Sequence, residues 1–316
     1  MMQQLWTNNT MQKTPLHLDI SDALHGLRLD QAIALAFSEH SRSRLKLWIL
    51  HGRVFVNGQP VTRPRAMVSE GDKIQIDPET VIAVHWAAED MPLSIVYEDE
   101  HLLVINKPAD LVVHPGAGNP SGTLVNALLH HCPSLEQVPR AGIVHRLDKD
   151  TTGLMVVAKT IVAQTGLVAA MQARAVKRVY EAIVYGVMVS GGTVDLPIGR
   201  HPRDRTRMAV IQSGREAITH YRVIKRFKAH THVRLQLETG RTHQIRVHMA
   251  HKRHPIVGDS AYGKRFSVES LKSFKRQALH ARQLALTHPL SQEPLSWEAP
   301  LPLDMQTLLA VLAANI

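Results

Sequence analysis

Residues 143–159 read IVHRLDKDTTGLMVVAK, and this stretch decides how the rest of the chain is organised. Two apolar residues, Ile143 and Val144, enter it. Residues 154–158 leave it as an apolar run rich in β-branched side chains, which predicts a buried strand. The Thr-Thr-Gly sequence at 151–153 predicts the turn that leads into this strand. The stretch therefore predicts a loop held between two buried segments.

The loop carries one carboxylate, Asp148, close in sequence to the guanidinium of Arg146. A carboxylate on a loop that a rigid scaffold holds in place can serve as a nucleophile or a base. A charge-paired turn without catalytic function is the alternative, and the four letters HRLD alone do not exclude it. The choice depends on the rest of the chain.

Composition restricts the class of protein. The chain has 316 residues, of which 44% are hydrophobic, enough for two domains with real cores. Lys and Arg number 37 against 27 acids, and a net charge of +10 favours a polyanion as partner. A membrane surface is the rival partner, but no apolar run approaches about 18 residues. The polar N-terminus and the single Cys132 lead us to expect a cytoplasmic protein without a signal peptide or an internal disulfide.

The N-terminal part reads as a flexible tail over residues 1–15, a compact unit over 16–77 and a linker over 78–92. Apolar spacing predicts one helix near 27–36 and a second that starts near Arg42 and ends at Gly52. Residues 54–61 predict a hairpin, because Asn57-Gly58 is the strongest short hairpin signal. Residues 74–76 predict a last strand.

Basic side chains are spread through this unit, namely Arg42, Arg44, Lys46, Arg53, Arg63 and Arg65. A solvated charged surface would explain them, since Arg on exposed helix faces is ordinary. In a chain of this charge we expect contact with RNA phosphates instead, through Arg42, Arg44, Lys46 and Arg53.

The remaining residues, 93–316, predict a second domain of the α+β class around a mixed, mostly antiparallel sheet. Pro108 and Pro115 predict a loop between its first strands and its first helix. The expected strands cover residues 93–97, 102–105, 154–158, 179–187, 217–227, 233–237 and 279–287, and the expected helices cover 124–131 and 162–176. Residues 199–214 predict a hairpin whose tip carries Arg200, Arg203, Arg205 and Arg207, which we expect to contact phosphates.

Five segments of the second domain together resemble the RluA-type pseudouridine synthases, which isomerise uridine within RNA. They are HRLDKDTTGL, INKPADLVVHPG, KRVYEAIVYG, ETGRTHQIRVHM and GDSAYG, in the family's order. The resemblance runs from about residue 92 to 300, and within the family it favours the RluD-like large-subunit (23S) ribosomal RNA synthases. Residues 16–77 resemble an S4-type RNA-binding domain. Two positions depart from the family pattern: Thr152 replaces a common Ser, and Asp110 a common Gly.

The resemblance implies a role for each residue of a catalytic site. Asp148 is the expected nucleophile, Arg246 the arginine that pairs with it and is expected to hold it bidentately, and Tyr180 the residue beside the flipped base. In the binding of the target nucleotide, Ile245 packs on the base, Arg146 props the RNA open, and His145 and Arg241 complete the site. His145 itself is expected to be a structural hydrogen-bonding residue rather than a general base.

Four histidines within twelve positions offer a competing interpretation as a metal site: His243, His248, His251 and His254. Their spacing does not match HExxH, and no cysteine lies nearby. We therefore expect no metal.

The combined prediction is a cofactor-free RNA pseudouridine synthase with an S4-like domain and a catalytic domain. The RluD-like resemblance alone implies that its target is large-subunit ribosomal RNA, in the interface stem-loop called helix 69. We expect a monomer with no membrane partner. The alternative is an S4-type RNA-binding factor of ribosome assembly that performs no catalysis, and the basic surfaces fit it equally well.

Overall fold

The computed structural model describes residues 14–37, 40, 42–78, 86–116, 118–263 and 274–314, and gives no side chains for residues 42–44. Most of the predicted tail (1–13) and linker (79–85) lies outside this description, as do the side chains of Arg42 and Arg44. The chain forms two compact units, residues 1–85 and 86–316, which are described separately.

The first unit packs the two predicted helices on a four-stranded antiparallel sheet, whose first strand was not predicted. The helices are α1 (Leu29–Ala36) and α2 (Arg42–Leu50), preceded by the short 3-10 turn η1 (Asp22–Leu24). The sheet has the order β1-β4-β2-β3, with β1 Leu16–Asp19, β2 Val54–Val56, β3 Gln59–Pro60 and β4 Lys73–Ile76. Asn57 and Gly58 both have positive φ, as a two-residue hairpin turn requires. Leu45, Trp48 and Ile49 are buried in the core.

The second unit is built on a nine-stranded sheet in the order β5-β6-β7-β14-β8-β13-β12-β9, with β15 also paired to β14. Its strands are β5 Ile95–Glu98, β6 Leu102–Lys107, β7 Thr152–Ala158, β8 Lys177–Tyr185, β9 Gly192–Asp195, β12 Ile218–Arg226, β13 His230–Leu237, β14 Leu279–Thr287 and β15 Pro294–Glu298. β7 and β14 form the parallel pair, and the other pairs are antiparallel. The predicted α+β architecture is confirmed, although β9 and β15 were not predicted.

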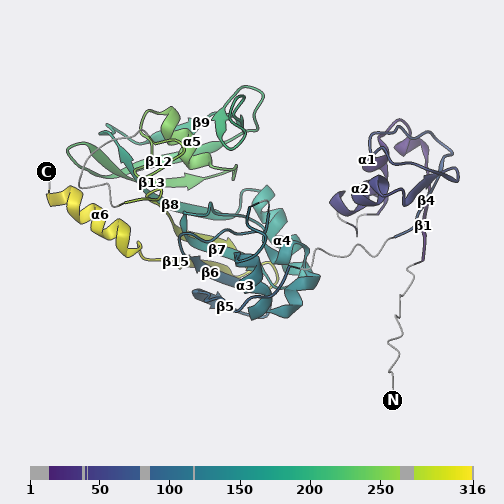
Figure 1. Cartoon of the computed structure of the whole chain (residues 1–316), viewed down its shortest axis with the longest axis horizontal. Coiled ribbons are helices and arrows are strands. Elements are labelled where there is room, and N and C mark those ends of the chain that lie inside the picture. The colour runs from purple at the N-terminus through teal and green to yellow at the C-terminus, as the bar shows by residue number, and fades with distance from the viewer. Residues whose placement is uncertain are drawn as a thin grey trace, which may run out of the picture. The chain divides into compact units, whose positions relative to one another are not determined.

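Helices and short turns cover this sheet, with α4 beside β7 and α5 beside β12 (Figure 1). The helices are α3 Leu124–His131, α4 Ile161–Gln172, α5 Gln244–His251 and α6 Leu303–Ala314, with 3-10 turns η2 Pro133–Gln137 and η3 Pro139–Gly142. The predicted helix 162–176 was too long, because the chain turns at Arg174, whose φ is +59°. It is also less amphipathic than predicted, since Ile161 and Val162 are exposed.

The predicted hairpin at 199–214 is present as β10 (Ile198–Arg200) paired with β11 (Met208–Val210). Residues 86–92, which we predicted to be linker, pack on the second unit: Trp86 and Met91 lie against its main core. The amide of Glu89 also donates to the carbonyl of Asn126 in α3. Within the described part of the chain, no helix combines the length and apolar character needed to cross a lipid bilayer.

The loop that carries Asp148 is anchored to β7 at its entering end, and its other end continues into this strand. Ile143 forms an antiparallel bridge with Val157, and the amide of Val156 donates to Nε2 of His145. These contacts cover the edge of β7 beyond its two-residue pairing with β14, where unpaired backbone groups would otherwise be costly. The loop is therefore held by the strand that it leads into.

The turn of this loop lies earlier than predicted. The amide of Thr151 donates to the carbonyl of Asp148, whereas Thr152 and Gly153 already belong to β7. Gly153 has a φ of +114°, and a Cβ there would lie 2.3 Å from the carbonyl oxygen of Ala281 in β14. Only glycine lets the two strands approach so closely.

Candidate active site

A cavity of about 620 Å³ lies beside the Asp148 loop in the second unit. It is lined by every residue that the sequence assigned to catalysis or to the target nucleotide: His145, Arg146, Asp148, Tyr180, Arg241, Ile245 and Arg246. They come from the 143–151 loop, from β8, and from α5 and the segment before it, which are far apart in sequence. The fold brings together the site that the resemblance implied.

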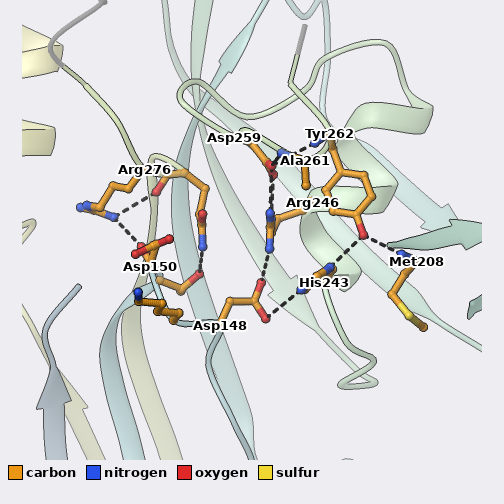
Figure 2. A network of polar contacts seen from close by, with 12 residues as sticks. Asp148, Asp150, Met208, His243, Arg246, Asp259, Ala261, Tyr262 and Arg276 are labelled. Carbon is orange, nitrogen blue, oxygen red and sulfur yellow. Dashed lines mark hydrogen bonds and ion pairs between the residues drawn. The ribbon is translucent and has the colours of Figure 1, made fainter. Parts of the chain in front are cut away.

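Asp148 is paired with Arg246, as expected, but by one hydrogen bond rather than two. Nη1 of Arg246 donates to Oδ2 of Asp148 at 2.9 Å. Its Nε and Nη2 donate to the two oxygens of Asp259, at 2.7 and 2.9 Å (Figure 2). The expectation that Arg246 grips Asp148 bidentately is wrong, because Asp259 takes the fork of the guanidinium.

Asp259 makes the guanidinium a fixed part of the protein. Its carboxylate is fully buried and also accepts the amides of Ala261 and Tyr262. Burial alone would raise the pKa of Asp259, but the hydrogen bonds and charge of Arg246 hold it below the usual value. Burial likewise opposes the charge on Arg246, while Asp259 and Asp148 raise its pKa well above normal. Arg246 thus stays charged and presents one oriented donor to Asp148.

His243 approaches the other oxygen of Asp148. Its Nε2 lies 3.8 Å from Oδ1, and its Nδ1 lies 2.8 Å from the hydroxyl of Tyr262. That hydroxyl accepts the backbone amide of Met208 in β11 (Figure 2). Asp148 is therefore flanked by Arg246 on one oxygen and by His243 on the other.

Two buried cations donate hydrogen bonds to the backbone of the Asp148 loop. Nζ of Lys107 donates to the carbonyls of Pro108, Leu111 and Lys149, and burial lowers its pKa to about 8. Nη1 of Arg276 donates to the carbonyl of Asp150. The Nε and Nη2 atoms of Arg276 are held by both oxygens of Asp304 in α6, at 2.6 and 2.9 Å. The position of the loop thus depends on β6 and on the C-terminal helix.

Tyr180 and Ile245 form an apolar wall of the cavity, and both are buried. Burial raises the pKa of Tyr180, Arg178 opposes the shift, and the charge of Asp148 adds to it. The phenol therefore stays protonated at neutral pH.

His145 has the structural role that the sequence suggested. Its Nε2 accepts the amide of Val156, and burial lowers its pKa to about 3. A ring held neutral and engaged with β7 is poorly suited to take up a proton during catalysis. Arg146 is exposed at the cavity, and Arg241 donates through Nε to the carbonyl of Glu216.

The predicted phosphate contacts have different environments. Arg200, Arg203 and Arg205 are exposed on the β10–β11 hairpin, and Lys46 and Arg53 are exposed in the first unit. Arg207 instead packs on the ring of Tyr262, with its guanidinium carbon 5.1 Å from the ring centroid. Arg207 therefore packs on the residue that contacts His243, whereas Arg200, Arg203 and Arg205 carry the hairpin's exposed charge.

The histidines of the competing metal interpretation have separate partners. His248 contacts the hydroxyl of Thr219 and the carbonyl of Leu196, and His254 contacts the carbonyl of Tyr185. Among the described residues, no group of three or more His, Cys, Asp or Glu side chains has an arrangement that could hold a metal ion.

Several site residues were not predicted from the sequence, and four of them are Lys107, Arg178, Asp259 and Tyr262. All four lie inside the segments that carry the family resemblance. Lys107 and Arg178 had a detectable signal, since each is a charged residue at the end of an apolar strand. Asp259 had no such signal beyond its motif. Its partner Arg246 is close in sequence, but the rest of α5 and a turn lie between them, so no local spacing pattern links the two residues.

The sequence matches two family models, the RNA pseudouridylate synthase model over residues 101–251 and the S4 domain model over residues 27–74. It is 58% identical to the ribosomal large subunit pseudouridine synthase D of Pseudomonas aeruginosa, over 92% of this chain and 93% of that protein. It is 54% identical to the protein of the same name from Escherichia coli strain K12, over 96% of each. The structure resembles the human RNA pseudouridylate synthase domain containing 4, with a TM-score of 0.56, 30% identity, and coverage of 70% of this chain and 93% of that one.

Proposed function

This chain belongs to the RNA pseudouridylate synthase family, and from that membership we propose that it isomerises specific uridines of large-subunit ribosomal RNA to pseudouridine. The substrate class is taken from the relatives named for that activity, which match the chain over nearly its whole length. The observation that carries the proposal is that Asp148, Arg246 and Tyr180 line one and the same cavity.

Pseudouridine formation breaks the bond between ribose C1′ and N1 of the base, turns the base, and joins C1′ to C5. The bond is glycosidic, so a carboxylate can add to C1′ or stabilise positive charge on the sugar. Both roles need an oriented carboxylate, and the hydrogen bond from Nη1 of Arg246 orients the carboxylate of Asp148. We assign Asp148 the role of nucleophile.

The target uridine must leave its stack to reach this carboxylate, which costs a few kcal/mol. Tyr180 and Ile245 offer an apolar surface for the flipped base, and Arg146, exposed at the cavity, takes the space that the nucleotide leaves in the RNA. The isomerisation removes a proton from C5 and adds one at N1, so Tyr180, whose phenol stays protonated, can release its own proton towards the base as it accepts the C5 proton. His145 and Arg241 complete the binding site for the nucleotide.

The rest of the RNA is held electrostatically. The S4 domain presents Lys46 and Arg53, with Arg42 and Arg44 in the same helical region of the sequence, and the hairpin presents Arg200, Arg203 and Arg205. We propose helix 69 as the target stem-loop and a cytoplasmic monomer without cofactor or metal as the working form. These finer assignments depend on the family resemblance and on the sequence.

A non-catalytic RNA-binding factor of ribosome assembly is the alternative. It accounts for the basic surfaces and the S4 domain equally well. It does not account for the oriented Asp148 carboxylate in a cavity of nucleotide size, which binding alone does not require.

The test uses large-subunit RNA from cells that lack this protein. Wild-type protein should form pseudouridine in it, while Asp148→Asn, which keeps the shape of the side chain, and Asp148→Ala should form none and bind the RNA about equally well. RNA with fluorine at C5 of the target uridine has no C5 proton to lose. It should therefore stall or yield an altered product with wild type and stay unchanged with both variants. Near-normal isomerisation by either variant would remove Asp148 as the nucleophile, and none by wild type would favour the binding factor.

A further inference from the structure

We propose that His243 is a second positioning residue for Asp148. In this role His243 donates a hydrogen bond from its Nε2 to Oδ1 of Asp148, the carboxylate oxygen that Arg246 does not contact. This inference rests on the proposed function, because it assigns His243 a part in orienting the nucleophile. Nothing in the sequence pointed to it, since His243 was considered there only as one of four histidines in a metal cluster.

The hydrogen-bond direction at His243 is favoured by its partner on the side away from Asp148. The backbone amide of Met208 can only donate, so the Tyr262 hydroxyl accepts it at 2.8 Å. The proton of that hydroxyl is then free to be donated to Nδ1 of His243, also at 2.8 Å. With Nδ1 as acceptor, a neutral imidazole carries its proton on Nε2, the atom that faces Asp148. A backbone amide thus favours this tautomer through two residues.

The ring of His243 is held in this orientation by backbone and packing. His243 precedes α5 and has a φ of +57°, a left-handed conformation that is unusual for a residue other than glycine and persists where surrounding structure enforces it. Its ring meets the ring of Tyr262 edge-on, with centroids 5.6 Å apart. The Tyr262 ring also lies 5.1 Å from the guanidinium carbons of both Arg207 and Arg246. The same aromatic ring therefore contacts both groups that flank Asp148.

The 3.8 Å between Nε2 and Oδ1 is longer than a hydrogen bond. Catalytic hydrogen bonds are often long in the free enzyme and shorten in the complex with substrate. A small rotation of the Asp148 carboxylate about its bond to Arg246 would bring Oδ1 within reach of Nε2. The geometry is that of a donor which engages when the nucleotide enters.

A neutral donor suits this task better than a second cation. Burial lowers the pKa of His243, the charge of Asp148 opposes this shift, Arg246 adds to it, Asp259 opposes it and Arg146 adds to it. The net effect keeps the imidazole uncharged at neutral pH. It can then orient Oδ1 without the full ion pair that would weaken the carboxylate as a nucleophile.

The decisive variants differ in reach. The amide nitrogen of Gln can occupy the place of Nε2, whereas Asn suits the left-handed backbone but reaches only the place of Nδ1, and Leu has no donor. We expect His243→Leu and His243→Asn to lower the single-turnover rate of pseudouridine formation by on the order of 10- to 100-fold, with RNA affinity within about twofold of wild type. His243→Gln should recover most of that rate. Because Asn tolerates the backbone, it tests the proposal even if the Leu variant folds poorly.

A spectroscopic measurement tests the tautomer without any substrate. ¹⁵N NMR of wild-type protein should show His243 protonated at Nε2, with Nδ1 as an acceptor. Tyr262→Phe keeps the ring and its contacts with Arg207 and Arg246 but removes the hydroxyl, so the preference for Nε2–H should weaken and the single-turnover rate should fall.

Two results would overturn the proposal: rates for His243→Leu and His243→Asn within about twofold of wild type, or an Nδ1–H tautomer in wild type. Failure of the proposed function looks different, because wild-type protein itself would then form no pseudouridine, while the NMR measurement would still decide the state of His243.

Discussion

Arg246 is bound more firmly to Asp259 than to Asp148. Two of its nitrogens donate to the two oxygens of Asp259, whose side chain is completely buried, and the one remaining donor reaches Asp148, which is partly exposed to the cavity. The pair of Arg246 and Asp259 forms a rigid platform, and Asp148 is the part left free to meet a substrate. Arg246 therefore has both a structural and a catalytic function, and a single substitution of Arg246 cannot separate the two.

Arg246→Met should affect both functions. It leaves Asp259 buried without its cation, which costs about 3–5 kcal/mol of stability, and it removes the donor that orients Asp148. We expect a loss of turnover much larger than the loss of RNA affinity. Adding Asp259→Asn to this variant removes the unpaired charge, so unfolding by urea should show part of the stability restored while single-turnover activity stays low. Recovery of activity together with stability would mean that Arg246 has no separate catalytic function.

Lys107 should make stability depend on alkaline pH. Its pKa is about 8 in the folded protein and 10.5 when exposed, so between these values the unfolded chain binds more protons and folding becomes more favourable as pH rises. Below about pH 8 the amine is protonated in both states, and this dependence vanishes. The unfolding free energy of wild type minus that of Lys107→Met, measured in urea from pH 7 to 10, should rise by about 3 kcal/mol at most. Parallel curves would show that Lys107 titrates normally.

Gly153→Ala should disrupt the anchoring of the Asp148 loop. The added methyl group would lie 2.3 Å from the Ala281 carbonyl oxygen at a φ of +114°, so the pairing of β7 with β14 must shift. We expect a loss of about 3 kcal/mol or more in stability, together with reduced turnover. Gly116→Ala is the matched control, because nothing lies within 4 Å of its Cβ position and its φ is not positive. Equal melting temperatures for the two variants would contradict this account.

Deletion of residues 1–77 should weaken RNA binding and flatten its dependence on salt, because fewer counterions are released when fewer phosphates are contacted. The cut keeps Trp86, which packs on the core of the second unit, so the remaining protein should stay folded by circular dichroism. Binding titrations between 50 and 200 mM salt, a range in which such contacts dominate, give the slope. An unchanged slope would mean that the S4 domain does not hold the RNA electrostatically.

Chelators should leave activity intact. The proposed reaction neither activates water nor polarises a phosphoryl oxygen, which are tasks for which metalloenzymes use their metal ion. The measurement is pseudouridine formation after treatment with EDTA and after subsequent addition of zinc. Loss of activity with EDTA and its return with zinc would revive the metal interpretation of the histidines.

The sequence by itself determined the local elements and the identity of the central loop. Apolar periodicity predicted α3 and β14, and Asn57-Gly58 predicted a hairpin turn. Both signals are local, because the burial of one face of an element and the geometry of a turn depend on residues that are neighbours in sequence. The family motifs assigned Asp148, Tyr180 and Arg246 to one site, and the cavity that they line confirms that they lie together. Short elements such as β9 and β15 were not predicted, because strands of so few residues show too little hydrophobic periodicity.

Only the tertiary structure decided how the site residues are connected. Asp148 and Arg246 are 98 positions apart, and no local pattern states which nitrogen of Arg246 meets which carboxylate. That choice follows from the packing of α5 and of the turn that carries Asp259, because Asp259 orients the guanidinium so that a single nitrogen faces Asp148. The tautomer of His243 depends in the same way on Met208 and Tyr262, from two other parts of the chain. Hydrogen-bond direction is a property of assembled geometry, and a linear sequence does not contain it.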